Sequence, residues 1–471
     1  MIETSAHHAP GLPDNVNMGA LCYYREANTG IRAQANIIVN FTEHISETAA
    51  ASKTLAKCSI LGAAAGVASG IASAVFLRLL DGATSLRESR PWMLFLLPLA
   101  GLLIGWIYDR YGQSVVAGTN LILESIHSKG IIAIPFRMVP LVLGGTILTH
   151  LFGGSAGREG TAVQMGGTLA NVLTKPLRLS LKDHRLLLMS GISGGFGSVF
   201  GTPLAGMVFG LEILSVGRVN YTALIPCFVA SCTGDIVCRT LGIQHATYSV
   251  GASLPEWTPY RCFLILVVSV LFAGAAAGFV SLTEGISHQM KARVKSPFLR
   301  PFLGGLILIG LTCLVGTHDY LGLSLPLIAK SFTAGHVAIW VFALKMLFTS
   351  VTLGTGFKGG EVTPLFCIGA TLGAAFAHLT GQPPTIFAAL GFVGVFAGAA
   401  NTPLTCILMG IELFGAKMAI PLAATCLITY VLSGHRGIYP SQLIAVSKAD
   451  SALADEEVQL RDVRDGKTRV E

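Results

Sequence analysis

Charged residues are scarce in this chain. Asp, Glu, Lys and Arg together make up 12% of its 471 residues, about half of the roughly 25% that is typical of soluble globular domains. Hydrophobic residues make up 52%, and the mean hydropathy is +0.65. This composition argues against a soluble enzyme and indicates a chain whose surface largely faces lipid.

Paired cysteines are also missing. The ten cysteines are scattered, mostly within apolar runs, and no Cys-x-x-Cys motif occurs. We therefore expect no metal and no cofactor, and cysteines that fill space in the interior. The basic residues that give the net charge of +7 lie in loops rather than on one face, so a nucleic-acid partner is not expected.

Long apolar runs are what the chain has in abundance. They predict membrane-spanning helices, and the strict alternation of a transmembrane barrel is missing. We expect an all-α polytopic membrane protein with about 17 to 18 tilted helices, several of them too short to cross the lipid bilayer alone. The clearest runs are residues 60–77, 92–108, 263–280, 302–315, 337–351 and 420–432.

These runs divide the chain into three parts. Residues 1–56 are polar and predict a cytoplasmic N-terminal segment with a short helix near 41–55, and no secretory signal peptide is recognised there. Residues 57–446 predict the transmembrane transport domain, and residues 447–471 a short charged cytoplasmic tail. Basic loops at 175–185 and 291–300 predict the cytoplasmic side, whereas the loop at 242–259 has no Lys or Arg. We expect a multi-pass protein of the inner (plasma) membrane with both termini in the cytoplasm.

An internal repeat divides the transport domain into halves, at about 57–240 and 261–446. Residues 191–212 and 391–412 carry the same Thr-Pro-Leu, Gly and Glu at a single offset of 200. A Gly-x-Glu-x-Thr motif stands about 40 residues before each Thr-Pro-Leu, at 157–161 and 359–363. Such duplication is typical of secondary transporters that bind substrate between the halves near the membrane midplane. We expect the two halves to be inverted.

The first motif, Gly157-Arg158-Glu159-Gly160, opens an apolar segment and predicts a helix that starts within the membrane. The free amides and positive dipole end of such a helix form an anion site. A carboxylate at Glu159 would compete with the anion, and protonating it would free the site. The chemistry therefore predicts coupling of protons to an anion, and the alternative is a glutamate that only complements the helix dipole.

Further polar residues stand in similar settings. Glu361 occupies the matching place in the second half, and Thr119 and Asn120 follow a glycine break where they could bind an anion or cap a helix. Lys358 could pair with a carboxylate, line an entrance to the site, or extend towards the membrane surface from a helix end. Glu212 and its repeat partner Glu412 suggest a shared structural duty, such as helix capping or a contact between subunits.

Together, the Gly-Arg-Glu-Gly motif, the glycine break before Thr119, the repeated Thr-Pro-Leu helices and the late Tyr439 resemble the CLC family of chloride channels and transporters. The resemblance covers roughly residues 57–446. It implies a CLC-type fold of two inverted repeats and a homodimer with one anion pathway in each subunit. It implies Glu159 as the gating and proton-transfer glutamate, and Tyr439 as an anion ligand on the inner side. Gly157, Arg158 and Gly160 belong to the same anion-binding motif.

Several positions resemble the fluoride-transporting branch, CLC-F. They are Asn120 at the first break, Thr161 in place of a proline, the additional Glu361, and Ile213 where chloride/proton exchangers usually carry an internal glutamate. The resemblance implies a fluoride/proton antiporter in the lipid bilayer that exports fluoride in exchange for protons. It also implies Glu361 in proton or anion coupling.

The anion-binding residues that this resemblance adds are Thr119, Asn120, Val362 and Thr363. Fluoride holds its hydration water tightly, so hydroxyl and amide donors suit it. A chloride/proton exchanger or a passive anion channel is the alternative function. An intramembrane enzyme is not expected, because neither a nucleophile elbow nor zinc-ligand spacing is present.

Overall fold

The structure is a computed structural model that describes residues 18–130, 132–174, 176–251, 256, 258–333, 336–448 and 453–465. Parts of the predicted terminal segments, residues 1–17, 449–452 and 466–471, lie outside these described residues. The chain divides into two compact units, Met1–Lys57 and Cys58–Glu471.

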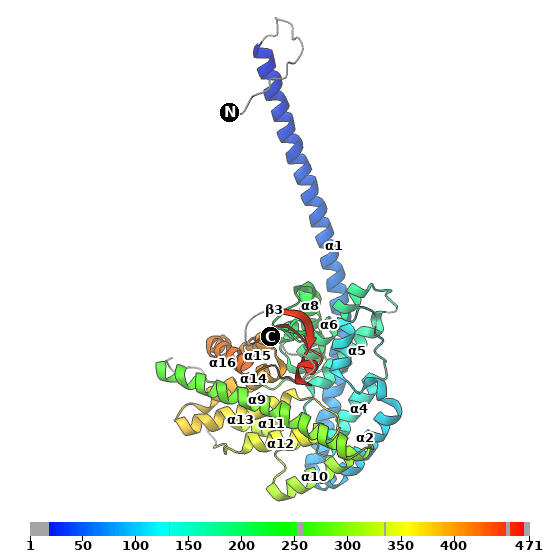
Figure 1. Ribbon diagram of the computed structural model, residues 1–471, viewed down its shortest axis with the longest axis vertical. Coiled ribbons are helices and arrows are strands. Elements are labelled where there is room, and N and C mark those ends of the chain that lie inside the picture. The colour runs from blue at the N-terminus through cyan, green and yellow to red at the C-terminus, as the bar shows by residue number, and fades with distance from the viewer. Residues whose placement is uncertain are drawn as a thin grey trace, which may run out of the picture. The chain divides into compact units, whose positions relative to one another are not determined.

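Helix α1 (Met18–Ser89) supplies the whole described part of the first unit and continues into the second (Figure 1). Residues 41–55 are part of this one helix rather than a separate short one, which differs from the sequence-based expectation. The physical reason is that no proline interrupts residues 18–89, and the stretch around 47–57 is rich in Ala and Lys, which are strong helix formers. The helix ends just before Pro91, because a proline disfavours helical geometry in the residue that precedes it.

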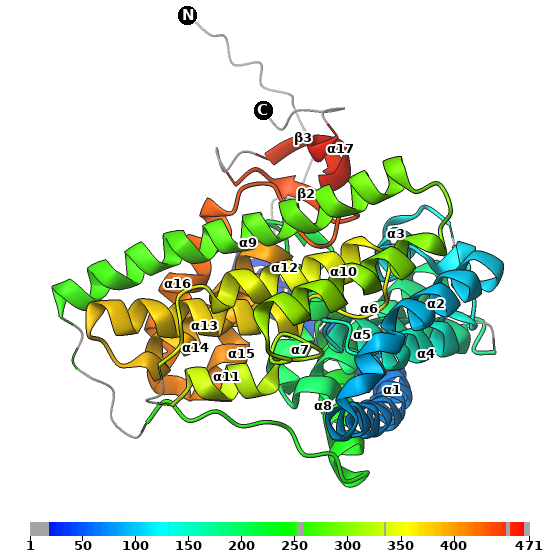
Figure 2. The ribbon, with the colours of Figure 1, turned by 90° about the horizontal axis from the view of Figure 1, so that it is seen from below.

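The second unit is mainly helical, and its helices cross one another at varied angles (Figure 2). They are α2 (Leu97–Tyr111), α3 (Thr119–His127), α4 (Met138–Leu151), α5 (Glu159–Thr174), α6 (Leu181–Phe200), α7 (Pro203–Glu212), α8 (Leu224–Thr240), α9 (Pro259–Arg293), α10 (Leu299–Val315), α11 (Leu325–Ser331), α12 (Val341–Gly354), α13 (Val362–Thr380), α14 (Pro384–Ala400), α15 (Pro403–Phe414), α16 (Ala419–Leu432) and α17 (Leu460–Arg464).

Only some of these helices can cross a membrane alone. Within the described residues, five helical stretches are long and apolar enough to do so, at 47–89, 91–111, 221–240, 259–293 and 362–380. Shorter apolar helices of 10–17 residues make up most of the rest. The prediction of a mainly helical membrane fold, with several helices too short to cross the bilayer alone, is confirmed.

The two halves of the repeat fold alike. Gly201 and Asn401, 200 residues apart, both adopt left-handed backbone geometry, with φ of 72° and 59°, and end α6 and α14. In each half a Thr-Pro pair follows and starts the next helix, where the missing N–H of proline costs nothing. The phenyl rings of Phe196 and Phe396, also 200 residues apart, stack with their centroids 6.3 Å apart at the centre of the core.

The halves are joined by reciprocal helix caps. Glu212, at the end of α7, accepts hydrogen bonds from the backbone N–H groups of Leu404 and Thr405 at the start of α15, at 2.9 and 2.8 Å. Glu412, at the end of α15, accepts from Leu204 and Ala205 at the start of α7, both at 2.9 Å. Each helix end therefore meets the other helix's beginning, so α7 and α15 run in opposite directions. The shared capping duty expected of Glu212 and Glu412 is confirmed.

A small sheet departs from the all-helical expectation. Strand β2 (Leu443–Val446) pairs in parallel with β1 (Ser215–Val216) and antiparallel with β3 (Leu453–Gln459). Leu460, at the start of α17, is buried against Val216 and Ile444. Part of the predicted tail at 447–471 is thus folded onto the helices of the second unit (Figure 2), because two short apolar stretches pair across a long gap in the sequence.

Candidate functional site

The two Gly-x-Glu-x-Thr motifs lie side by side where the halves of the repeat meet. The N–H of Gly157 donates to the carbonyl of Gly360 at 2.6 Å, and the N–H of Gly360 donates to the carbonyl of Gly157 at 2.8 Å, in an antiparallel bridge. A Cβ atom at Gly360 would lie 2.8 Å from the backbone nitrogen of Gly160, so only glycine permits this approach. The helices α5 and α13 therefore begin at the same place in the fold.

The carboxylate of Glu159 is fully buried at the start of the other half's helix. Its Oε2 accepts hydrogen bonds from the backbone N–H groups of Thr363 and Arg158, both at 3.1 Å, and its Oε1 accepts from the Thr363 hydroxyl. The Arg158 Nε lies 3.5 Å from Oε1. The carboxylate thus occupies the positive end of α13, where a helix N-terminus stabilises an anion. We expected Glu159 at a helix start, but the helix it complements belongs to the second half.

A polar cavity of about 250 Å³ lies next to the paired motifs. Thr119, Asn120, Gly160, Glu361 and Tyr439 all line it. These residues come from α3, α5, the segment before α13, and the segment after α16, so the fold brings together side chains that are far apart in the sequence. Of the other sequence-predicted site residues, Gly157, Arg158, Glu159, Val362 and Thr363 belong to the paired motifs rather than to the cavity lining.

The glycine break before α3 shapes one wall of the cavity. Gly118 has a φ of +59°, a geometry that favours glycine, and Thr119 begins the helix. The side chain of Asn120 does not cap α3; its Oδ1 accepts a hydrogen bond from the backbone N–H of Ser441 at 3.1 Å. Asn120 therefore anchors the segment that carries Tyr439.

Other polar side chains line the cavity, among them Lys358 and two that the sequence did not identify, Gln164 and Tyr108. Gln164 Nε2 lies 3.4 Å from the Thr119 hydroxyl, and Lys358 Nζ lies 4.1 Å above the ring of Tyr108, in a cation–π contact. Among the described residues, no ion pair joins Lys358 to Glu159 or Glu361. Of the alternatives predicted for Lys358, the structure contradicts pairing with a carboxylate and agrees with a place in the lining of the site. The signal for Gln164 was its position one helical turn after Gly160, on the same face of α5.

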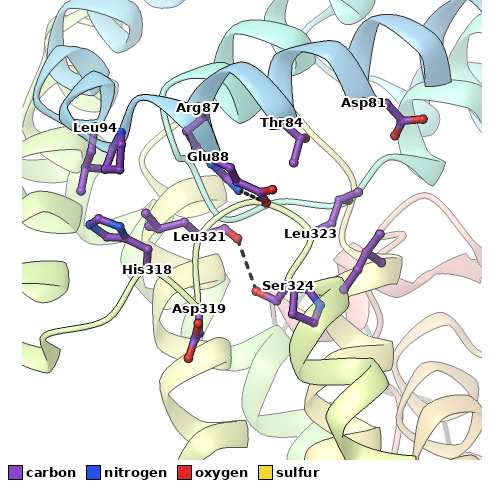
Figure 3. Close-up of a pocket in the computed structure, with 13 residues that line it drawn as sticks. Asp81, Thr84, Arg87, Glu88, Leu94, His318, Asp319, Leu321, Leu323 and Ser324 are labelled. Carbon is purple, nitrogen blue, oxygen red and sulfur yellow. Dashed lines mark hydrogen bonds and ion pairs between the residues drawn. The ribbon is translucent and has the colours of Figure 1, made fainter.

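A second cavity, of about 480 Å³, lies between the end of α1 and residues 318–326. Figure 3 shows Arg87 and Glu88 on α1, with His318 and Ser324 on the facing segment. This segment is tied to the chain that leads into the first motif, because the N–H of Gly322 donates to the carbonyl of Gly154 at 3.1 Å.

A buried lysine holds the same junction together. Lys345, on α12, is fully buried, and its Nζ donates to Ser155 Oγ at 2.9 Å and to the Gly322 carbonyl and Ser324 Oγ, both at 2.8 Å. Ser155 lies two residues before Gly157, so Lys345 fixes the approach to the first motif. An ionisable residue within an apolar run was the available signal for it.

Comparisons with known proteins agree with this geometry. The family model described as voltage gated chloride channel matches residues 100–434. A protein of Pseudomonas syringae pv. tomato described as a chloride/fluoride channel protein is 46% identical over 416 residues, which cover 87% of this chain and 91% of that protein. The H(+)/Cl(−) exchange transporter ClcA of Yersinia pestis is 28% identical over 330 residues, which cover 65% and 67% of the two chains.

Solved structures give the same result. A CLC-type fluoride/proton antiporter superposes with a TM-score of 0.79 at 35% identity, covering 83% of this chain and 98% of that one. A slow cyanobacterial Cl−/H+ antiporter, 21% identical, shares the fold with a TM-score of 0.69 over 80% of this chain and 94% of its own. By its sequence and its fold, the chain therefore belongs to the CLC family of voltage gated chloride channel proteins.

Proposed function

We propose that the protein is an antiporter that exports fluoride across the membrane in exchange for protons. The observation that carries this proposal is the Glu159 carboxylate, which occupies the anion-stabilising start of α13 beside a polar cavity. An anion and the ionised carboxylate compete for the same donors. A proton on Glu159 removes its charge and releases those donors, so binding of a proton and binding of an anion become linked.

The cavity is suited to a small, strongly hydrated anion. Stripping water from fluoride requires replacement donors. The Thr119 and Tyr439 hydroxyls, the Gln164 amide and the Lys358 ammonium all belong to residues that line the cavity. The likeness to the structure of a fluoride/proton antiporter supports fluoride over chloride, whereas the relative described as a chloride/fluoride channel protein names both anions.

Glu361 supplies a second acid on the path. It lines the cavity, whereas Glu159 lies at the adjoining helix start. We assign Glu361 to receiving the proton, or to balancing charge, when Glu159 leaves its place. Ile213, after α7, is an apolar residue that cannot do so.

The protein is further proposed to be a homodimer in the inner (plasma) membrane, with both termini in the cytoplasm. The basic residues near the start of α6 and the end of α9 support this orientation under the positive-inside rule. Family membership supports the dimer.

The test is fluoride efflux from proteoliposomes, with pH recorded on the same sample. Fluoride leaving the vesicles should drive protons in the opposite direction. In Glu159→Gln, which cannot ionise, proton movement should stop while the protein stays folded. Exposed Glu47→Gln serves as the matched control and should behave like the unchanged protein.

Three outcomes would contradict the proposal. Chloride moving as fast as fluoride would remove the fluoride assignment and favour a chloride/proton exchanger. Fluoride flux without opposing protons would remove antiport and favour a passive channel. Gradient-driven exchange that persists in Glu159→Gln would remove the gating role of that residue.

A further inference from the structure

A basic pocket lies apart from the polar cavity next to the paired motifs. It has a volume of about 760 Å³ and is formed by the end of α3, the start of α6, the end of α7 with the segment that follows it, and Leu443 of β2. It shares no lining residue with the cavity that holds Glu361 and Tyr439. A ligand in it would therefore not occupy the anion path.

The charge of this pocket has one sign. Lys182, Arg185 and Arg218 line it together with His127, and within the described part of the chain neither Asp nor Glu is among the lining residues. Arg185 is held in place because its guanidinium donates to the Ser128 carbonyl at the end of α3. A cation fixed before binding loses little conformational entropy when it meets an anion.

The rest of the lining is mostly apolar. Tyr221, whose side chain is strongly exposed, stands at the rim and can contact both water and lipid. The apolar lining residues are Ile126, Leu181, Leu186, Met189, Leu211, Leu214, Val219 and Leu443. A ligand that fits both parts carries a negative head and an apolar body.

We propose that the basic pocket binds the phosphate headgroup of an anionic phospholipid. Basic pockets between membrane helices on the cytoplasmic side bind anionic lipid headgroups. Lys182 and Arg185 lie in the first two turns of α6, and the positive-inside rule assigns this basic start of the helix to the cytoplasmic side. Inorganic phosphate shares the charged chemistry but uses none of the apolar lining. The pocket therefore selects a lipid over a free phosphate ion.

The test uses the purified full-length chain. Phosphatidylglycerol is titrated onto the delipidated protein and counted by native mass spectrometry, with phosphatidylcholine as the neutral lipid. Phosphatidylglycerol should bind more tightly than phosphatidylcholine. Lys182→Gln and Arg218→Gln should each weaken its binding about fivefold, since one basic residue near an anionic surface contributes on the order of a fivefold change in affinity.

The matched control is Arg293→Gln, which removes the same charge from an exposed site at the end of α9. It should bind phosphatidylglycerol like the unchanged protein. Lys182→Arg, which keeps the positive charge that Lys182→Gln removes, should also bind like the unchanged protein. Equal loss in Arg293→Gln, or unchanged binding in both pocket variants, would overturn the proposal. In a second titration, inorganic phosphate at millimolar concentration should not displace bound phosphatidylglycerol. Displacement of the lipid by phosphate, together with equal binding of phosphatidylglycerol and phosphatidylcholine, would overturn the lipid assignment.

Discussion

Thr363 controls the position of the Glu159 carboxylate most directly, because it supplies both a backbone N–H and a hydroxyl to it. Thr363→Val removes the hydroxyl and keeps the shape of the side chain, whereas Thr363→Ser keeps the donor. A hydrogen bond to a charged group contributes about 1.5–3 kcal/mol, so the balance between bound and released Glu159 should shift at least about tenfold in Thr363→Val. We expect fewer protons to move per fluoride in that variant, measured with fluoride and pH electrodes on one vesicle sample. Identical coupling in the valine and serine variants would show that the hydroxyl has no part in it.

Single residues were predictable where an ionisable or polar group stands beside glycine in an apolar run. That signal identified Glu159, Glu361 and Thr119, and the structure places all three at the junction of the halves. Their partners were not predictable in the same way. The contact between Glu159 and Thr363 spans about 200 residues of sequence, and nothing local to either residue specifies which helix start receives the carboxylate.

At the scale of helices, the reciprocal caps should not contribute equally. Glu212 is 5% exposed and accepts three hydrogen bonds, two from N–H groups and one from the Thr405 hydroxyl. Glu412 is less buried and accepts two. Loss of a helix cap costs about 0.5–2 kcal/mol, so Glu212→Ala should lower the melting temperature in detergent more than Glu412→Ala, and exposed Glu47→Ala should leave it unchanged. The reverse order would show that the caps do not determine the stability of this junction.

Lys448, near the end of α16, should make the stability of the fold depend on pH. Lys448 follows β2, and its Nζ donates to Asn401 Oδ1 at 2.6 Å and to the carbonyls of Tyr430 and Gly434 at 2.9 and 2.8 Å. Burial lowers the pKa of Lys448 to about 7, below the ordinary value of about 10.4 that the unfolded chain keeps. Between these values the folded chain binds fewer protons than the unfolded chain, so its stability should rise with pH by at most about 1.4 kcal/mol per unit.

Lys448→Gln lacks this titration. The melting temperature of the unchanged protein, relative to that of the variant, should therefore rise between pH 7 and 9. The reason is that burying the charged ammonium is unfavourable, and the folded chain loses this charge across the range. Both proteins are to be melted in the same detergent and buffers. A constant difference between the two melting temperatures would mean that Lys448 stays protonated throughout.

At the scale of the whole molecule, the repeat and the apolar runs sufficed to predict the two-halved helical fold. The offset of 200 residues appears again in the paired turns at Gly201 and Asn401 and in the stacked Phe196 and Phe396. The small sheet was not predictable, since β1 has only two residues and pairs with a strand more than 200 positions away. The continuous α1 was missed because a change from polar to apolar residues was read as the end of a structural element, whereas the backbone has no reason to stop there.

The location of the site within one chain leads to a last prediction, which rests on the proposed dimer. Among the described residues, one chain by itself supplies donors to the Glu159 carboxylate and a complete lining for the adjacent polar cavity. Two copies linked in tandem, one of them carrying Glu159→Gln, should therefore show about half of the proton-coupled fluoride flux of the linked unchanged pair. A linked pair with Glu47→Gln in one copy is the control and should keep full flux. The same vesicle assay with fluoride and pH electrodes measures it, and complete loss in the mixed pair would mean that the pathways of the two subunits depend on each other.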